Sequence, residues 1–212
     1  FPIKKIIKRA KEKGILTIVD GAHVPGHLDL KINDLGCDFY TGALHKWLCA
    51  PKGTSFLFVK KEHHSWMKPV IYSWGKNGDD PGPTEFLQDF QWQGTRDMSS
   101  FLTIPKAIEF YHECIKPLQE KCRQINLEAY SKFQVALGTE PLSEGAGWIG
   151  QMVSHPLPTD IPENLKKILL DNHKIEIPIF EWKGINLIRI SIQIYNTKKD
   201  VESLMSALAS LN

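Results

Sequence analysis

The first twenty residues constrain the fold more than any other part of the chain, because an amphipathic helix leads directly into a short apolar strand. Residues 3–13 place isoleucines on one face and basic side chains around the rest, and Gly14 follows where helices commonly end. Residues 15–19 are apolar or β-branched, and Asp20 ends the run. A helix that enters a buried strand of this kind is the second half of a β-α-β crossover, which predicts an α/β fold with a parallel sheet.

The strand that should precede this helix is not in the chain, so we expect a fragment of a longer protein; a second polypeptide that supplies the missing strands is the alternative. Further short strands are predicted over residues 37–41 and 54–59, and residues 73–85 are predicted to form an irregular loop rich in Gly, Pro and Asp. Residues 104–137 read as a long helix bent near Pro117. The remainder predicts a small α+β domain, with strands over 148–155, 175–182 and 187–194 and helices over 162–172 and 198–211.

The bulk composition is that of an ordinary globular protein, and it sets aside several classes of function. Hydrophobic residues make up 42% of the 212 residues, charged residues 24%, and the net charge of +2 gives no reason to expect a nucleic-acid partner. No apolar stretch approaches the ~20 residues of a membrane helix, and no secretion signal is visible, so we expect a cytoplasmic protein with reduced cysteines. The histidine spacing does not suggest a metal site.

Two groups at predicted strand ends suggest a cofactor. Asp20 ends one apolar strand, and Lys46 lies in the otherwise uncharged segment 41–47, where burial would favour the free amine. Pyridoxal 5′-phosphate (PLP) needs a lysine for a Schiff base and an acid for its ring nitrogen, and open α/β sheets bind ligands at the carboxyl ends of their strands. His23, three residues after Asp20, is a candidate to contact the ring's phenolic oxygen. The alternatives are that Asp20 only begins a turn and that Lys46 extends to the surface.

Two further segments contain candidate ligand-binding residues, each with an alternative interpretation. Thr95 follows Gly94 and offers a hydroxyl and an N–H to an anion, but the same residues could form a plain turn into the following helix, with Asp97 or Ser99 as its N-cap. Arg189 is the one charged residue of an apolar strand, which suits recognition of a substrate carboxylate. It could equally pair with an acid such as Glu181 on an edge strand.

Four motifs in the same order resemble the class V aminotransferases, the fold-type-I PLP superfamily that includes cysteine desulfurases and isopenicillin N epimerase. The motifs are Asp20-Gly-Ala-His23-Val-Pro-Gly, Leu44-His45-Lys46-Trp47-Leu-Cys-Ala-Pro-Lys-Gly, Gly94-Thr95-Arg96-Asp97, and Arg189-Ile-Ser with Tyr195-Asn-Thr-Lys-Lys-Asp200. The resemblance implies that residues 1–103 are the C-terminal half of the PLP-binding large domain. Residues 104–212 would then be a connecting helix and a small C-terminal α+β domain.

The resemblance also implies a role for each matching residue. Lys46 would form the Schiff base, Asp20 would pair with the pyridine nitrogen, and His23 would lie against the phenolic oxygen. His45 would lie near the phosphate together with Thr95, which in this family comes from the partner subunit. Arg189 would bind the α-carboxylate of an amino-acid or amino-acid-conjugate substrate. These roles imply a homodimer with shared active sites.

Two departures from the family pattern bear on activity. Ala43 stands where a Ser or Asn often holds the cofactor, and the family's earlier phosphate-binding segment is not in the chain, so we expect this chain alone to bind PLP weakly. No cysteine follows Cys122, which disfavours desulfurase chemistry. The local similarity favours an epimerase or C–S lyase. A true transaminase and a non-catalytic remnant that only dimerises or binds a partner remain alternatives.

Overall fold

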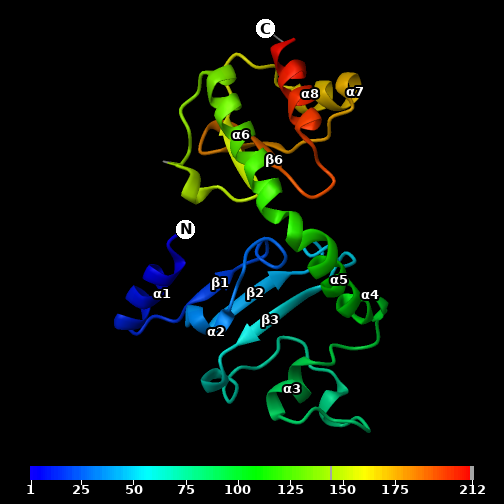
Figure 1. Cartoon of the computed structure of the whole chain (residues 1–212). Coiled ribbons are helices and arrows are strands. Elements are labelled where there is room, and N and C mark those ends of the chain that lie inside the picture. Colours follow the sequence, from blue (N-terminus) through cyan, green and yellow to red (C-terminus); the bar gives the residue numbers. More distant parts are fainter. Residues whose placement is uncertain (144, 211–212) are drawn as a thin grey trace. The chain divides into compact units, whose positions relative to one another are not determined.

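The computed structural model describes residues 1–143 and 145–210, and the chain forms two compact units, Phe1–Tyr111 and His112–Asn212. Each unit contains its own three-stranded sheet (Figure 1). The boundary predicted between residues 103 and 104 falls between two short helices of the first unit, α4 (Ser99–Leu102) and α5 (Ile104–Phe110). The assignment of residues 1–103 and 104–212 to two family domains stays a prediction.

The first sheet pairs strands in the order β1-β2-β3, where β1 is Ile18–Asp20, β2 is Phe39–Ala43 and β3 is Ser55–Val59. β1 and β2 are parallel, and β3 is antiparallel to β2. Helix α1 (Ile3–Glu12) and the short helix α2 (Ile32–Leu35) precede β1 and β2 respectively. The apolar face of α1 places Ile7 in a core with Cys37 and Tyr40. The predicted helix-to-strand connection and the parallel pairing are therefore present.

The first strand is shorter and more exposed than the sequence predicts. Only the last three residues of the expected strand pair with β2, and Ile15, Leu16 and Ile18 are exposed, Ile18 by 77%. The reason is topological, because within the described residues β1 lies at the edge of its sheet and only β2 pairs with it. The central strand β2, in contrast, is buried at four of its five positions.

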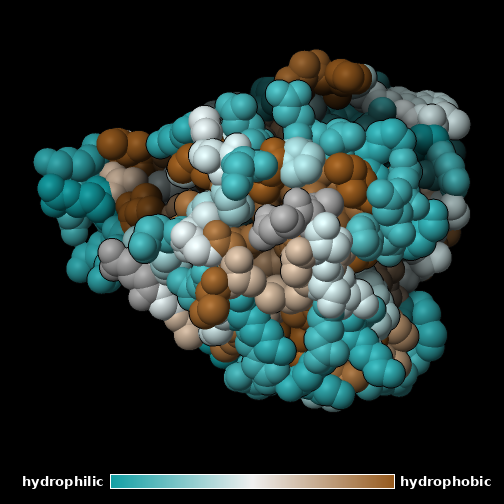
Figure 2. Space-filling model, turned by 90° about the horizontal axis from the view of Figure 1, so that it is seen from above, coloured by the Kyte–Doolittle hydropathy of each residue, from teal (hydrophilic) through white to brown (hydrophobic). Residues whose placement is uncertain are grey.

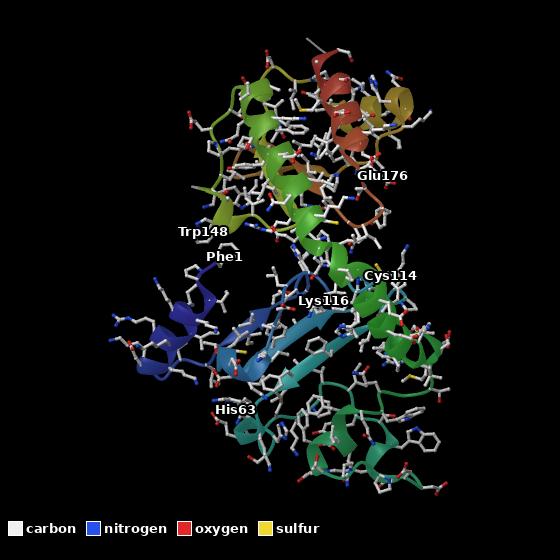
Figure 3. The ribbon with its side chains drawn as sticks, viewed as in Figure 1. Phe1, His63, Cys114, Lys116, Trp148 and Glu176 are labelled. Carbon is white, nitrogen blue, oxygen red and sulfur yellow. The ribbon has the colours of Figure 1, made fainter. Side chains whose placement is uncertain are left out.

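After β3 the first unit continues with short helices and loops. The 3₁₀ turn η1 (Lys61–His63) follows β3 directly, and Figure 3 shows His63 near the end of that strand. The predicted irregular loop 73–85 contains a single 3₁₀ turn, η2 (Trp74–Lys76), before helix α3 (Glu85–Phe90) begins. The Thr84 hydroxyl caps α3 by accepting a hydrogen bond from the Leu87 N–H at 3.2 Å. The prediction of a mainly irregular loop is confirmed.

The long helix predicted over residues 104–137 is interrupted where its proline predicts a bend. After α5 come a π-helical segment, η3 (Tyr111–Ile115), the 3₁₀ turn η4 (Lys116–Leu118) and helix α6 (Gln119–Leu137). Pro117 has no N–H, and its ring would clash with the carbonyl of Glu113 in a continuous α-helix. Pro117 lies instead near the start of the 3₁₀ turn η4, directly after the π-helical segment ends at Ile115.

The second unit is a small antiparallel sheet covered by helices. Its strand order is β4-β6-β5, where β4 is Met152–Pro156, β5 is Ile179–Trp182 and β6 is Ile185–Ser191. A 3₁₀ turn, η5 (Ala146–Trp148), precedes β4, and helices α7 (Leu165–His173) and α8 (Lys198–Ala209) complete the unit. The core packs residues from α6, α7, α8 and β6, among them Phe133, Leu169, Ile188 and Leu204. The predicted end of the last helix at Leu211 lies outside the described residues.

The fold class predicted from sequence is confirmed: a mixed α/β unit is followed by a small α+β unit. In the view of Figure 2, hydrophobic side chains are interspersed among hydrophilic ones. No helix within the described residues is long and apolar enough to cross a membrane.

Candidate active site

Asp20 and Lys46 lie beyond the carboxyl ends of two neighbouring parallel strands. Asp20 is the last residue of β1 and is in register with Thr41 of β2. Lys46 follows the end of β2 by three residues. Since β1 and β2 run in the same direction, both residues belong to the same edge of the sheet, which is where open α/β sheets bind ligands.

The Asp20 carboxylate is exposed and also shapes the loop that follows it. Its Oδ1 accepts a hydrogen bond from the N–H of Ala22 at 2.9 Å, which forms a turn immediately after the strand. The alternative interpretation of Asp20 as a turn residue is therefore correct for one oxygen. The two interpretations are compatible, because a carboxylate has a second oxygen and four lone-pair directions.

The end of the Lys46 side chain contacts the loop that follows β1. Its Nζ lies 3.1 Å from Nε2 of His23, so the structure brings together the lysine and the histidine that the sequence singled out. The expectation that Lys46 is buried is wrong: its side chain is exposed. The next two residues, Trp47 and Leu48, are buried and anchor the loop after β2, whereas the Lys46 side chain is in contact with solvent.

Two aromatic side chains that the sequence analysis missed support His23. The indole N–H of Trp47 donates a hydrogen bond to Nδ1 of His23 at 3.2 Å. The ring of His27 stacks on Trp47 with ring centroids 4.3 Å apart and planes 24° apart. Burial lowers the pKa of His27, an effect that its hydrogen bond to the His23 carbonyl partly opposes. The presence of Trp47 directly after Lys46 was the available signal.

Gly26 allows the two loops to approach each other. A Cβ at this position would lie 2.6 Å from the Leu48 nitrogen and 2.7 Å from the Trp47 carbonyl carbon, and the backbone has φ of +79°. Both the space and the left-handed conformation therefore require glycine. The Pro25-Gly26 turn is what places His23 against Lys46 and Trp47.

The other predicted cofactor ligands of the first unit have separate surroundings. Nδ1 of His45 lies 3.0 Å from the carbonyl oxygen of Thr54. Thr95 is exposed in a turn where Gly94 has φ of +113°. Asp97 accepts a hydrogen bond from the Ser99 N–H at 2.8 Å, which lowers the pKa of Asp97. The N-cap of α4 is Met98, so neither Asp97 nor Ser99 is the helix cap that the alternative interpretation expects. The roles of His45 and Thr95 toward a phosphate stay predictions.

Arg189 belongs to the second unit, where it lies in β6 opposite Ser154 of β4. Because β6 is the central strand of its sheet, the interpretation of Arg189 as an edge-strand residue is wrong. Within the described residues it has no ion pair, and its buried Nε has no hydrogen-bond partner. A cavity of about 430 Å³ is lined in part by Arg189, Ser191 and Asn196. The guanidinium is thus not paired with an acid of the described part of the chain.

A third cluster of titratable groups lies around Asp38, at the start of β2. Asp38, Glu62 and His63 present potential metal-ligating atoms within 4.8 Å of one another. However, the Lys60 ammonium lies 3.0 Å from Glu62 and 3.8 Å from Asp38, so both carboxylates are already paired with a cationic side chain. His63 donates a hydrogen bond to Asp38 at 3.1 Å, so this hydrogen bond and the ion pairs of Lys60 already join the groups of the cluster.

With this geometry established, comparison with known proteins identifies the family. The family model described as aminotransferase class-V matches residues 1–204. The chain belongs to the class-V aminotransferase family. Over its whole length it is 33% identical to isopenicillin N epimerase of Amycolatopsis lactamdurans, of which it covers 56%, and 29% identical to a probable chloroplastic L-cysteine desulfhydrase of Arabidopsis thaliana, of which it covers 48%.

Solved structures agree on the fold. The apo structure of cysteine desulfurase from Thermococcus onnurineus NA1 superposes with a TM-score of 0.80 at 20% identity, over 99% of this chain and 55% of that one. The cysteine desulfurase CsdA of Escherichia coli gives a TM-score of 0.73 at 20% identity, over 99% of this chain and 54% of that one. This class-V chain therefore has the fold-type-I architecture and spans about half the length of the relatives that it matches.

Proposed function

We propose that the protein containing this chain is a PLP-dependent enzyme that acts at the α-carbon of an amino-acid substrate. Class-V aminotransferase relatives of this kind are PLP-dependent, and the two relatives named above are an isopenicillin N epimerase and a probable L-cysteine desulfhydrase. The observation that carries the proposal is the 3.1 Å contact between Lys46 Nζ and His23 at the sheet edge where β1 ends in Asp20.

The side chains present fit this cofactor chemically. PLP needs an amine for its aldehyde, an anion for its ring nitrogen and a polar group for its phenolic oxygen. Lys46, Asp20 and His23 provide these three groups from the end of β1 and from the loops that follow β1 and β2. Bound PLP supplies an electron sink that makes the Cα proton of an amino acid acidic.

The chain's own residues would then divide the work as follows. Lys46 would hold the aldehyde covalently and, once released by the substrate, accept the Cα proton. Asp20 would keep the ring nitrogen protonated through its second oxygen. Arg189, whose guanidinium has no ion pair within the described residues, would bind the substrate carboxylate in bidentate fashion.

Within the family we propose the epimerase or C–S lyase branch over a true transaminase. The motifs around Asp20 and Lys46 and the 33% identity to an epimerase support this choice. The lack of any cysteine after Cys122 weighs against desulfurase chemistry, and the desulfurase structures at 20% identity support the fold alone. We also propose a homodimer in which Thr95, exposed in its turn, contacts the cofactor of the partner subunit.

A non-catalytic binding module is the second candidate, and Ala43 is the observation that favours it. Ala43 ends β2 and is buried, so the polar contact that the family often makes from this position is lost. The two candidates differ in one measurable property: only the enzyme needs the amine of Lys46.

The test compares Lys46→Ala with Lys52→Ala, a matched control because Lys52 is another exposed lysine of the same loop. Each intact protein is incubated with PLP, reduced with borohydride and analysed by peptide mass spectrometry. We expect a phosphopyridoxyl group on Lys46 in the wild type and in the control, and none at that position in Lys46→Ala. Attachment elsewhere, or unchanged turnover in Lys46→Ala, would overturn the proposal.

The substrate is then sought with the intact enzyme. Amino acids, cysteine conjugates and their sulfoxides are screened for racemisation, pyruvate and keto-acid formation. Racemisation or pyruvate would support the branch that we propose, whereas transfer of the amino group to a keto acid would favour the transaminase.

A further inference from the structure

The hydrogen bond between Trp47 and His23 determines where the imidazole carries its proton. An indole N–H can only donate, so the Nδ1 atom that lies 3.2 Å from it must offer a lone pair. A neutral imidazole has one protonated nitrogen. The proton of neutral His23 is therefore on Nε2.

This assignment in turn constrains Lys46. Nε2 of His23 is the atom that lies 3.1 Å from Lys46 Nζ, and with its proton in place it can only donate. In that tautomer Nε2–H can form a hydrogen bond only with the free-amine form of Lys46, because an ammonium group has no lone pair to accept it. If a charged Lys46 donated to Nε2, the proton of the neutral imidazole would have to be on Nδ1. The Nδ1–H would then face the indole N–H of Trp47, and neither group could accept a hydrogen bond from the other.

We propose that Trp47 is a positioning residue that fixes the tautomer of His23, so that Nε2 presents an N–H toward Lys46 Nζ and can hydrogen-bond only the free-amine form of that group. The inference rests on the proposed function only in that the amine is the group expected to hold PLP. Trp47 contacts neither substrate nor cofactor in this account. Its effect passes through one imidazole ring.

The surroundings of Trp47 fix the indole in the orientation that the proposal needs. Trp47 is 7% exposed, and His27 stacks on its ring at 4.3 Å. Gly26 lets the loop that carries His23 and His27 approach the backbone of Trp47 and Leu48. A buried tryptophan fills space in many cores, but space filling alone does not require that its N–H point at an imidazole nitrogen.

The exposure of Lys46 makes such a device useful. Lys46 is exposed, so burial does not hold its side chain in place. A fixed donor at 3.1 Å can orient the free amine, because an N–H interacts favourably with the lone pair of a free amine and unfavourably with an ammonium group.

The test uses Trp47→Phe, which keeps an aromatic ring for His27 to stack on and removes the N–H. Trp74→Phe is the matched control, because Trp74 is 62% exposed in η2 of the same unit. The readout is the ¹⁵N NMR spectrum of His23 in the intact protein without PLP, assigned with His23→Gln. Long-range proton–nitrogen couplings distinguish the Nε2–H tautomer from the Nδ1–H tautomer.

We expect the Nε2–H tautomer in the wild type and in Trp74→Phe, and a mixture of tautomers in Trp47→Phe. The second readout is the rate at which Lys46 captures PLP at fixed pH. We expect this rate to fall by roughly 2- to 10-fold in Trp47→Phe, because the variant loses the effect of one neutral hydrogen bond. An Nδ1–H tautomer in the wild type, or an unchanged spectrum in Trp47→Phe, would overturn the inference.

The outcomes separate this inference from the proposed function. If PLP does not attach to Lys46, the proposed function fails while the NMR spectrum still decides the tautomer. If PLP attaches but Trp47→Phe lowers only the stability, Trp47 is a packing residue and the positioning role is refuted.

Discussion

Replacing Gly26 by alanine tests whether the candidate site depends on the close approach of its two loops. The added Cβ would lie 2.6 Å from the Leu48 nitrogen and 2.7 Å from the Trp47 carbonyl carbon, where contacts between a Cβ and backbone atoms essentially never occur. Neither neighbour is a flexible side chain that could move aside. The backbone also has φ of +79°, which costs a residue with a Cβ about 1–2 kcal/mol. Relieving the overlap adds about 1–3 kcal/mol.

Gly14→Ala separates the two contributions. Gly14 also has a positive φ, +67°, but a Cβ there meets nothing within 4 Å. We therefore expect Gly14→Ala to lose about 1 kcal/mol of unfolding free energy, since a stiffer unfolded chain offsets part of the strain. Gly26→Ala should lose about 2–4 kcal/mol, the sum of strain and overlap less the same offset from the stiffer unfolded chain.

The assay is urea denaturation of the intact protein, followed by intrinsic fluorescence at fixed pH. A second measurement, PLP capture by Lys46, should fall in Gly26→Ala because His23 and Trp47 are pushed apart, and should be unchanged in Gly14→Ala. Equal losses of stability in the two variants would refute the reasoning, because they would show that the loops do not need this contact.

Two buried groups predict losses of stability in separate pH ranges. Burial lowers the pKa of His155 to about 4, so the unfolded chain binds this proton at a higher pH than the folded chain does. The free energy of unfolding should therefore fall by about 3 kcal/mol as the pH drops from 6.5 to 4. His155→Phe should abolish this pH dependence in urea titrations, and a dependence that persists would contradict the assignment. Burial alone would raise the pKa of Asp38, but hydrogen bonds from His63 and Thr17 outweigh it and hold the pKa at about 2. The stability that Asp38 contributes is thus complete above pH 4, and about 2 kcal/mol of it is lost between pH 4 and 2. Asp38→Asn should be less stable than the wild type at pH 7 and should lack this acid dependence. A parallel loss of stability in the wild type and the variant would count against this role of Asp38.

Local sequence patterns predicted most elements of the fold because local physics fixes them. The isoleucine spacing and Gly14 define α1, β-branched and aromatic residues define β2 and β3, and Pro117 breaks the long helix wherever the rest of the chain lies. Burial is a different matter, because it depends on neighbours. Ile18 was predicted to be buried from its apolar context and is 77% exposed, since its strand lies at the edge of the described sheet.

The composition of the candidate site was also readable, but not its internal contacts. The sequence by itself determined the chemical types: an acid at a strand end, one lysine in an uncharged segment, and a histidine near the acid. Only the tertiary structure decided that Lys46 is exposed, that its nitrogen meets His23, and that Trp47 donates to the same ring. The physical reason is that hydrogen bonds join residues more than twenty positions apart, and their partners follow from how β1 and β2 align and how closely Gly26 lets the loops approach.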